Sequence, residues 1–166
     1  NQTTLPTVLV MGGSGVIGTA ICSRFTEANW LVGIHYNQHE PYTKETYPHL
    51  PQGQKNQVLF QADVRNPIQV KNMINQFIKQ WGKIDAFIWA VGQTSDTVTR
   101  RLTTEQWKNV IQVNLTGLFY CLQALGPIFK TQQTGAALIV SSLASTQGTT
   151  GQTAYAASKA GVLGLM

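Results

Sequence analysis

The chain has 166 residues, of which 43% are hydrophobic and 11% charged, and its formal net charge is +5. This length fits one globular domain, and no apolar run approaches the ~20 residues that a membrane-spanning helix needs. The first residues, NQTTLPT, have neither the basic nor the apolar region of a signal peptide, so we expect a cytoplasmic protein with no membrane partner.

The basic residues are scattered along the chain, and Arg100 and Arg101 form the only adjacent pair. A positive net charge suits nucleic acid, an acidic protein partner or a phosphorylated ligand equally well. Nucleic-acid binders more often cluster their basic residues on one helix. We therefore expect an ordinary solvated surface and no nucleic-acid partner.

The two cysteines, Cys22 and Cys121, both fall in helix-like segments. Buried thiols of a reducing compartment suit this placement better than a disulfide does. A metal site would need further ligands nearby. We therefore expect neither a disulfide nor a bound metal.

The predicted elements alternate between strand and helix along the whole chain. Short apolar runs predict the strands, and apolar residues at helical spacing predict the helices between them. The polar, proline-bearing stretch 37–56 is predicted to be a surface loop. The predicted strands cover 7–11, 31–36, 57–63, 84–91 and 136–142, and the predicted helices cover 16–28, 67–81, 104–131 and a last segment that begins near Tyr155.

Two of these helices carry clear signals at their ends. Asn66 is expected to cap the second helix, with Pro67 at its first position and Gly82 as its stop. Thr103 and Gln106 can form a capping box at the start of the third. The inward face of the second helix is expected to consist of Val70, Met73, Ile74, Phe77 and Trp81.

The order of the elements predicts the fold class. The apolar run IDAFIWAV is continuous rather than alternating, which implies a strand covered on both faces. Alternating strands and helices call for right-handed crossovers and a parallel sheet between two helical layers. We predict a single α/β domain over 1–166, a Rossmann-type doubly wound parallel sheet with helices on both faces.

The stretch MGGSGVIG joins the first strand to the first helix. Gly12 permits a tight turn, Gly15 lets a phosphate approach without meeting a Cβ, and Gly18 lets the helix pack closely on the strand. The free N–H groups and the dipole at the helix start attract an anion. In this strand-turn-helix context the glycines predict a dinucleotide site, with Ser14 and Ile17 as further contacts, and a glycine-rich turn without a ligand is the alternative.

The end of the second strand indicates which dinucleotide is bound. NAD-binding folds place a carboxylate about 20 residues after the glycines, where it holds the ribose 2′-OH. The stretch HYNQ carries no acid, and the nearest is Glu40. His35, Tyr36 or Asn37 would tolerate a 2′-phosphate, although no arginine lies there either. We therefore expect NADPH rather than NADH, with Tyr36 and Asn37 among its contacts.

Tyr155 and Lys159 lie four residues apart at the start of the last helix and share one face. A free phenol has a pKa near 10, which is too high for proton exchange at neutral pH. A nearby ammonium and a helix N-terminus both favour the phenolate, so Lys159 could make Tyr155 a usable acid or base. Ser142 follows the fifth strand, where doubly wound folds place their ligands, and its hydroxyl could hold a carbonyl oxygen.

Taken together, these motifs resemble the short-chain dehydrogenase/reductase family, and within it most closely the 3-oxoacyl-[acyl-carrier-protein] reductases. The resemblance covers essentially the whole chain. The motifs occur in the family's order, as VLVMGGSGVIG, DV at 63–64, VNLTG at 113–117 and YAASKAG at 155–161.

The resemblance implies a role for each catalytic residue. Tyr155 would protonate the substrate carbonyl oxygen as hydride arrives from the nicotinamide, and Lys159 would bind the nicotinamide ribose. Ser142, whose spacing of 13 residues from Tyr155 agrees with the family, would orient the carbonyl. Asn114 would anchor a water that links Lys159 to solvent. Taken alone, Asn114 could merely relieve a helix irregularity, and Tyr155 could belong to the core.

The resemblance also implies contacts to the cofactor. Asp63 would hydrogen-bond the adenine amino group with Val64 beside it, although Asp63 alone could be a strand-end cap. The family's NNAG after the fourth strand appears here as WAVG, so that Ala90 replaces a hydrogen-bonding asparagine and Gly92 is retained. The backbone at Ala90 and Gly92 can still lie beside the nicotinamide, but the change puts cofactor affinity and site rigidity in doubt.

The sequence ends at Met166, 11 residues after Tyr155. A dinucleotide fold of this kind needs the last helix to cross back to a sixth strand. We therefore expect the C-terminal strands to be missing from this chain as part of a longer protein, which leaves an apolar GVLGLM face and an open sheet edge exposed.

The leading hypothesis is an NADPH-dependent reductase of a ketone, such as a 3-oxoacyl thioester on acyl carrier protein or coenzyme A. Arg100 and Arg101, at the mouth of the predicted site, could meet such an acidic carrier or phosphate. The rival hypothesis is a catalytically impaired dinucleotide-binding regulatory or scaffold protein, prompted by WAVG.

The third predicted helix bears on the oligomeric state, because it carries Phe119, Tyr120 and Phe129 beyond its inward set. In the family this helix pairs with its twin, which implies a homodimer or homotetramer. The alternative is that these residues simply cover the sheet.

Overall fold

The computed structural model describes residues 5–39 and 56–166, and within them the predicted alternation of strands and helices is confirmed. Glu40 and most of the predicted 37–56 loop lie outside the described residues. The elements are β1 (Thr7–Met11), α1 (Val16–Glu27), β2 (Leu31–Tyr36), β3 (Gln57–Gln61), α2 (Pro67–Trp81), β4 (Ala86–Trp89), the 3-10 turn η1 (Thr99–Arg101), α3 (Thr104–Ile111), the π-helical segment η2 (Gln112–Thr116), α4 (Gly117–Gln132), β5 (Ala136–Ile139), α5 (Ala144–Gln147) and α6 (Thr153–Gly164).

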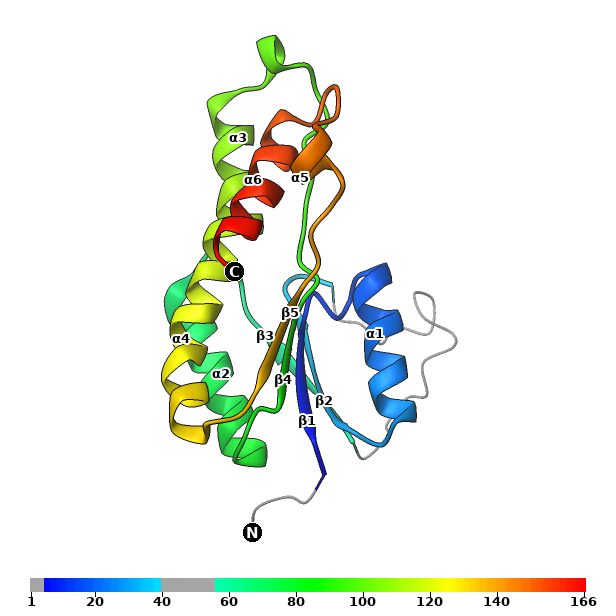
Figure 1. Ribbon diagram of the computed structural model, residues 1–166, viewed down its shortest axis with the longest axis vertical. Coiled ribbons are helices and arrows are strands. Elements are labelled where there is room, and N and C mark those ends of the chain that lie inside the picture. The colour runs from blue at the N-terminus through cyan, green and yellow to red at the C-terminus, as the bar shows by residue number, and fades with distance from the viewer. Residues whose placement is uncertain (1–4, 40–55) are drawn as a thin grey trace.

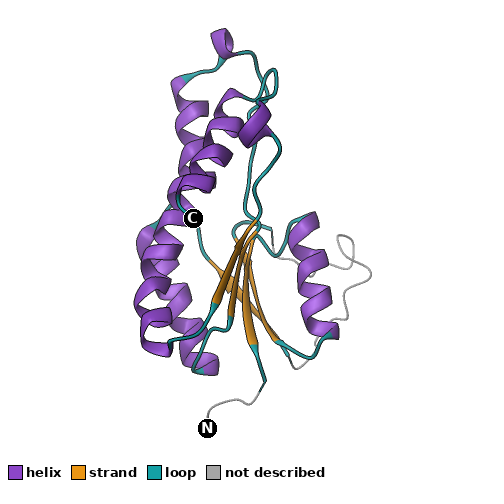
Figure 2. Cartoon of the chain, viewed as in Figure 1, coloured by secondary structure: helices purple, strands orange, loops and turns teal. Residues whose placement is uncertain are grey.

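The five strands form one parallel sheet in the order β3-β2-β1-β4-β5. β1 lies at the centre, where Val8 is opposite Val32 of β2 and Ala86 of β4. α1 covers one face of the sheet, and α2 and α4 cover the other (Figures 1 and 2). This is the predicted doubly wound arrangement, and its topological switch point lies at the carboxyl ends of β1 and β4.

The core consists of two apolar clusters, one on each face of the sheet. Leu9 and Met11 of β1 belong to the cluster beneath α2 and α4, whereas Val8 and Val10 belong to the cluster beneath α1. Successive side chains of a strand point to opposite faces, so both sets are buried. The double burial explains why β4 and, after Thr7, β1 are apolar at successive rather than alternate positions.

The predicted helix signals are confirmed in α2 and α3. The Asn66 side chain accepts hydrogen bonds from the backbone N–H groups of Ile68 and Gln69, and Gly82 ends α2 in the left-handed region at φ 80°. Thr103 and Gln106 form the capping box of α3. The five residues predicted for the inward face of α2 are all buried.

The structure differs from the sequence predictions in three places. The helix predicted over 104–131 is divided into α3, η2 and α4, because a π-helical segment interrupts it around the buried Asn114. β3, β4 and β5 end earlier than predicted, and β4 begins at Ala86 rather than at residue 84. The end of β4 follows from β1, which makes its last pair at Met11 with Trp89 and then turns away. The loop predicted before α6 contains a short helix, α5, that was not predicted.

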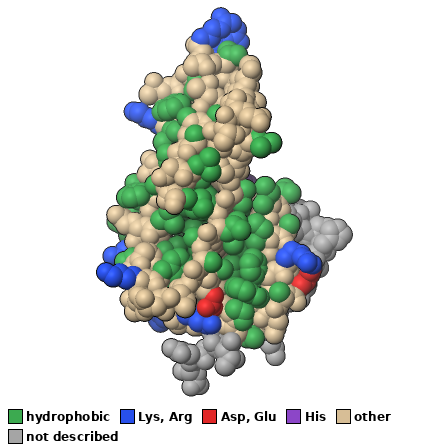
Figure 3. Space-filling model, viewed as in Figure 1, with side chains coloured by type: hydrophobic (Ala, Val, Ile, Leu, Met, Phe, Trp, Pro, Cys, Tyr) green, Lys and Arg blue, Asp and Glu red, His purple; other side chains and the backbone are tan. Residues whose placement is uncertain are grey.

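Hydrophobic side chains are exposed along β5 and at the end of α6. Leu138 is 54% exposed on β5, and Leu163 and Met166 are 45% and 72% exposed. Figure 3 shows hydrophobic side chains gathered over the middle of the molecule, where these segments lie. The expected apolar face and open sheet edge are therefore present.

The two cysteines are buried and form no disulfide, as predicted. Burial raises the pKa of the Cys22 thiol to about 12 and raises that of Cys121 as well. Among residues 5–39 and 56–166, no three His, Cys, Asp or Glu side chains gather closely enough to hold a metal ion. Within the same residues, no helix has both the length and the apolar character needed to cross a bilayer.

Candidate active site

The glycine turn after β1 has the backbone shape that its sequence predicts. Gly12 adopts φ 75°, and its carbonyl oxygen accepts a hydrogen bond from the N–H of Gly15 at 3.0 Å. A Cβ on Gly18 would lie 2.0 Å from the Gly12 carbonyl oxygen, so α1 can begin this close to the turn only without a side chain there. A Cβ on Gly15 would meet nothing nearer than that oxygen at 3.4 Å. Gly15 is also exposed, which leaves its outer side open to a ligand.

A groove of about 350 Å³ runs across the carboxyl ends of the strands from this turn. It brings together nine of the residues predicted to bind the cofactor, namely Gly12, Ser14, Gly15, Tyr36, Asn37, Asp63, Val64, Ala90 and Gly92. Ile17, by contrast, is 56% exposed on α1 and does not line the groove, and Gly18 is buried under the start of α1.

A larger hollow of about 960 Å³ lies along α3. It shares only Arg65 with the groove, and the predicted catalytic residues Ser142, Tyr155, Lys159 and Asn114 line neither of the two. The smaller groove is the candidate binding site, because it lies at the topological switch point and contains the glycine turn.

His35 lines the groove beside Tyr36 and Asn37, and both of its ring nitrogens are bonded to the protein's own backbone. It is 3% exposed, its Nδ1 accepts a hydrogen bond from the Gly12 N–H at 3.0 Å, and its Nε2 lies 2.9 Å from the Ala62 carbonyl oxygen. The first bond makes Nδ1 the acceptor, so the proton is on Nε2 and is donated to Ala62. Burial lowers the pKa of His35 to about 4, so the ring is neutral. His35 therefore ties the glycine turn to the end of β3.

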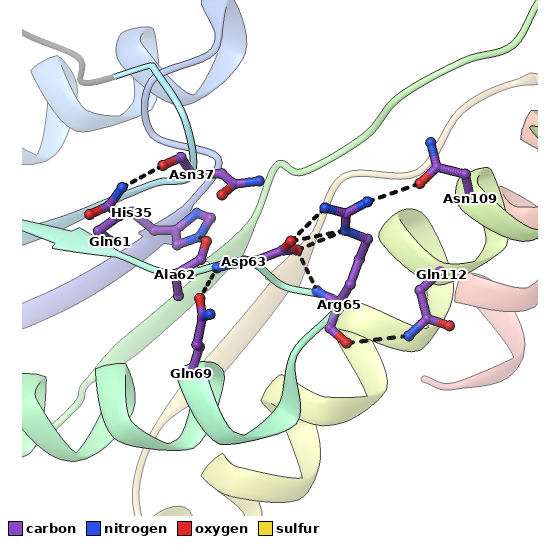
Figure 4. Close-up of polar contacts among 9 residues, drawn as sticks. All are labelled: His35, Asn37, Gln61, Ala62, Asp63, Arg65, Gln69, Asn109 and Gln112. Carbon is purple, nitrogen blue, oxygen red and sulfur yellow. Dashed lines mark hydrogen bonds and ion pairs between the residues drawn. The ribbon is translucent and has the colours of Figure 1, made fainter.

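Asp63 lies in the groove, where its carboxylate is held by Arg65 (Figure 4). The guanidinium donates from Nε and Nη2 to both carboxylate oxygens, with Nη2 at 2.6 Å from Oδ2. These bonds lower the pKa of Asp63, which is therefore charged at neutral pH. The sequence has no arginine at the end of β2, yet Arg65 reaches the same groove from the end of β3.

Lys159 lies on α6, with its side chain buried beneath the groove end. The residue is 3% exposed, and its Nζ donates to the Val140 carbonyl oxygen at 2.9 Å. Nζ lies 5.8 Å from the centroid of the Tyr155 ring, and a Cβ built on Gly92 would be 3.5 Å from it. Burial lowers the pKa of Lys159, because the ammonium loses hydration. The amine therefore lies between the predicted catalytic phenol and the lining of the groove.

Ser142 follows β5, two residues after the carbonyl that holds Lys159. Its Oγ accepts a hydrogen bond from the Ala144 N–H at 3.2 Å, at the start of α5, and α5 packs against α6. A hydroxyl that accepts one bond still has its own proton to donate. Ser142 is half-buried, so that proton remains accessible to a ligand.

Asn114 is fully buried in η2, and its side chain joins three segments. Oδ1 accepts from the Gln93 N–H at 2.9 Å, and Nδ2 donates to the Gln93 carbonyl oxygen and to Ser158 Oγ. Both donors of the amide are used by these bonds. Asn114 therefore does accompany a helix irregularity, and it also fixes the chain after β4 against α6.

Two features that shape the groove were not predicted from the sequence: the contact of Arg65 with Asp63 and the inward orientation of His35. Arg65 could have been found from its position two residues after Asp63, at the carboxyl end of a strand. The inward orientation of His35 could have been suspected because it is a polar residue within an otherwise apolar strand, LVGIHY.

The comparison with protein families agrees with this geometry. A family profile described as short chain dehydrogenase matches residues 6–166. The chain belongs to the short-chain dehydrogenase family. Within this family, the chain is 31% identical over 157 residues to the 3-oxoacyl-[acyl-carrier-protein] reductase FabG of Staphylococcus epidermidis, covering 95% of the chain. It is 30% identical over 161 residues to the 3-oxoacyl-[acyl-carrier-protein] reductase of Synechocystis, covering 97% of the chain. The chain spans only 64% and 65% of the lengths of these two relatives.

Solved structures of short-chain dehydrogenases have the same fold. A short chain dehydrogenase from Bacillus anthracis superposes with a TM-score of 0.88 at 27% identity, covering 96% of this chain and 66% of the other. The aldohexose dehydrogenase of Thermoplasma acidophilum, in ligand-free form, gives a TM-score of 0.85 at 28% identity, covering 97% of this chain and 58% of the other.

Proposed function

We propose that the chain supplies the cofactor site and the catalytic side chains of an NADPH-dependent oxidoreductase that reduces a ketone to a secondary alcohol. The observation that carries this proposal is the buried Lys159 ammonium, held by the Val140 carbonyl between the Tyr155 ring and Gly92. Within residues 5–39 and 56–166 no carboxylate pairs with this ammonium. Burying such a charge is costly, and perturbed ionisable groups are more frequent at functional sites.

The glycine turn fits the diphosphate of a dinucleotide. Gly15 is exposed and presents no side chain to a ligand, and α1 begins there without a side-chain cap at its N-cap residue. These N–H groups and the helix dipole can hold a phosphate. The rest of the groove supplies Asp63 and Val64 for the adenine and Ala90 and Gly92 for the nicotinamide side.

NADPH is favoured over NADH because Tyr36, Asn37 and Gln38, which line the groove after β2, carry no carboxylate. A carboxylate at this place would bond the ribose 2′-OH of NADH and repel the 2′-phosphate of NADPH. When bound, the reduced nicotinamide supplies the hydride.

The side chains of the chain supply the proton and orient the substrate. The Ser142 hydroxyl donates a hydrogen bond to the carbonyl oxygen of the ketone, and Tyr155 gives that oxygen its proton. Lys159 Nζ donates one of its three N–H groups to the Val140 carbonyl oxygen. The other two remain for the ribose hydroxyls of the cofactor and for Tyr155. Asn114 holds α6 in place through Ser158, beside Lys159, and its link to solvent through a water is part of the proposal.

A 3-oxoacyl thioester is the proposed substrate class, since the staphylococcal and cyanobacterial relatives carry that activity in their names. Arg100 and Arg101 are exposed at the tip of the molecule, where Figure 3 shows basic side chains. Thr99, next to them, bonds Thr153 at the start of α6 through their hydroxyls, at 2.7 Å. The two arginines therefore lie beside the helix that carries Tyr155, and we propose that they meet the acidic carrier of the substrate.

A self-associating surface on α4 is part of the proposal. Phe119 is 45% exposed, whereas Tyr120 and Phe129 are partly buried against the core. Phe119 is therefore the residue of the three that is available to a second copy in a homodimer or homotetramer.

The test measures NADPH oxidation by the complete protein with an acetoacetyl thioester, beside Tyr155→Phe. The variant is expected to bind NADPH as the parent does and to lose at least about a hundredfold in kcat, since it cannot donate the proton. Equal turnover in both proteins would exclude Tyr155 as the acid. NADPH binding with no turnover in either would favour a dinucleotide-binding scaffold instead.

A further inference from the structure

Ser158 is a buried hydroxyl on α6 to which the proposed mechanism assigns no chemical step. The residue is 0% exposed and lies three positions after Tyr155 and one before Lys159. Because it is fully buried and does not line the groove, it cannot touch a ligand bound there. An effect of Ser158 on the reaction must therefore act through another residue.

The Ser158 hydroxyl both donates and accepts a hydrogen bond. Its Oγ donates to the Tyr155 carbonyl oxygen at 2.7 Å and accepts from Asn114 Nδ2 at 2.9 Å. A serine hydroxyl has a single proton, so the first bond uses its only donor and the second needs a partner that donates, as the Asn114 amide does. The two bonds run in one direction, from Asn114 through Ser158 to Tyr155, and hydrogen bonds in such a series strengthen one another.

The other end of this series is anchored beside the groove. Asn114 Oδ1 accepts from the Gln93 N–H at 2.9 Å, and Nδ2 also donates to the Gln93 carbonyl oxygen at 3.0 Å. Gln93 and its neighbour Gly92 line the groove after β4. Two buried side chains therefore connect the main chain of Tyr155 to the wall of the groove on which the nicotinamide side of the cofactor is proposed to lie.

The place of Tyr155 in α6 explains why this connection matters. The helix begins at Thr153 and lies beside η2 and α3 (Figure 1), so Tyr155 belongs to its first turn. The ends of helices fray, and the main chain of the first turn decides where the phenol stands. A misplacement of about 1 Å at a reacting group can cost about a hundredfold in rate.

We propose that Ser158 is a positioning residue that holds the Tyr155 phenol at the distance from the cofactor wall that proton transfer requires. Ser158 carries no proton to the substrate, since its only proton is donated to the Tyr155 carbonyl oxygen. This inference rests on the proposed reductase function and adds to it the residue that connects the acid to the cofactor wall.

The experiment compares the complete protein with Ser158→Ala, using NADPH and an acetoacetyl thioester, and expresses kcat per NADPH-binding site so that unfolded protein is not counted. Ser158→Ala is expected to lower kcat by about ten- to a hundredfold, because the acid is displaced. The Kd of NADPH and the KM of the thioester should stay within about twofold of the parent, because ground-state binding is kept. Ser158→Thr retains a hydroxyl that can bond the same helix carbonyl, so it should recover kcat to within about threefold of the parent.

Thr26→Ala is the matched control. Thr26 Oγ1 likewise donates to a helix carbonyl, that of Cys22 at 2.8 Å, and accepts from a side-chain amide, Gln57 Nε2 at 2.7 Å. It lies on α1 and does not line the groove, so its loss should leave kcat per site unchanged.

Four results would each show that the Ser158 hydroxyl has no positioning role. Ser158→Ala could keep the parent's kcat, could lose it no more than Thr26→Ala does, or could fail to bind NADPH, which would mean that the serine serves the fold alone. Ser158→Thr could also recover none of the lost kcat, which would mean that side-chain volume and not the hydroxyl matters. If the parent itself binds no NADPH or shows no turnover, the proposed function fails instead.

Discussion

Replacing His35 by Asn tests whether a buried neutral imidazole holds the glycine turn to the end of β3. The Asn carbonyl oxygen can take over the hydrogen bond from the Gly12 N–H, because it stands at the same distance along the side chain as Nδ1. Asn is too short to reach the Ala62 carbonyl oxygen that His35 bonds at 2.9 Å. At neutral pH the variant is expected to lose about 1–3 kcal/mol in the free energy of unfolding, which is the cost of one unpaired buried group.

The larger effect is a change in how stability depends on pH. The pKa of His35 is about 4 in the folded protein and 6.5 in the unfolded chain, so the folded state favours the neutral ring. The stabilisation is complete above the unfolded pKa and is lost as the pH falls from 6.5 towards 4, because the unfolded chain takes up the proton first. Through this linkage, His35 lowers the free energy of unfolding by about 2 kcal/mol at about pH 5 and by about 3 kcal/mol at about pH 4, relative to neutral pH.

Urea unfolding of the complete protein at a series of pH values measures this loss. Asp63 and Asp85, whose pKa values are lowered below the usual value of 3.8 in the folded state, destabilise the protein mainly below about pH 5. Asp63 also interacts with the charge of His35, so the comparison is made above that pH, where both carboxylates are ionised in both proteins. The parent-minus-variant difference therefore isolates His35, and it should shrink as the pH falls from about 7 to about 5. A difference that stays constant over this range would show that His35 is not a buried neutral group, and the account of the turn would be refuted.

Three further predictions follow from packing and burial. Gly18→Ala places a Cβ 2.0 Å from the Gly12 carbonyl oxygen, so it should lower the free energy of unfolding by about 1–3 kcal/mol and abolish NADPH binding. Gly126→Ala is the control, because its Cβ would meet nothing within 4 Å, and it should be neutral or stabilising by about 0.5 kcal/mol. Urea unfolding and NADPH titration measure both variants, and similar effects of the two would contradict the packing argument. Asn114→Asp removes two buried donors and should cost about 3 kcal/mol, so an unchanged urea midpoint would show that these bonds are dispensable. Cys22 and Cys121 should resist iodoacetamide in the native protein and react after denaturation, as read by mass spectrometry, and native labelling of either would disprove its burial.

The sheet could be predicted because its signals are local. Continuous apolar runs define β1 and β4, and Asn66 and Gly82 mark the two ends of α2, so neither needs knowledge of distant contacts. The strand ends were less predictable, because β4 stops where its neighbour β1 turns away rather than where its own sequence changes. The break in the helix predicted over 104–131 likewise depends on Asn114 meeting Gln93 and Ser158, which are distant in sequence.

In the candidate site, too, the features encoded by a few neighbouring residues could be predicted, and those that depend on distant contacts could not. The glycine turn and the Tyr155–Lys159 pair are each encoded within a few residues, and the structure gives them the expected local shape. The hydrogen-bond partners of His35 could not be read from LVGIHY, because both are backbone groups that follow other strands, at Gly12 and Ala62. Their binding and catalytic roles stay predictions that the experiments above test.

Much of the polar framework around the site is made by the main chain. Val140 holds the Lys159 amine through its carbonyl oxygen, and Gly12 and Ala62 hold His35 through an amide and a carbonyl. Every residue type other than proline offers the same two groups, so substitutions at Val140 or Ala62 can leave these anchors intact. Homologues can therefore vary at such positions while the same functional geometry is inherited through the path of the backbone.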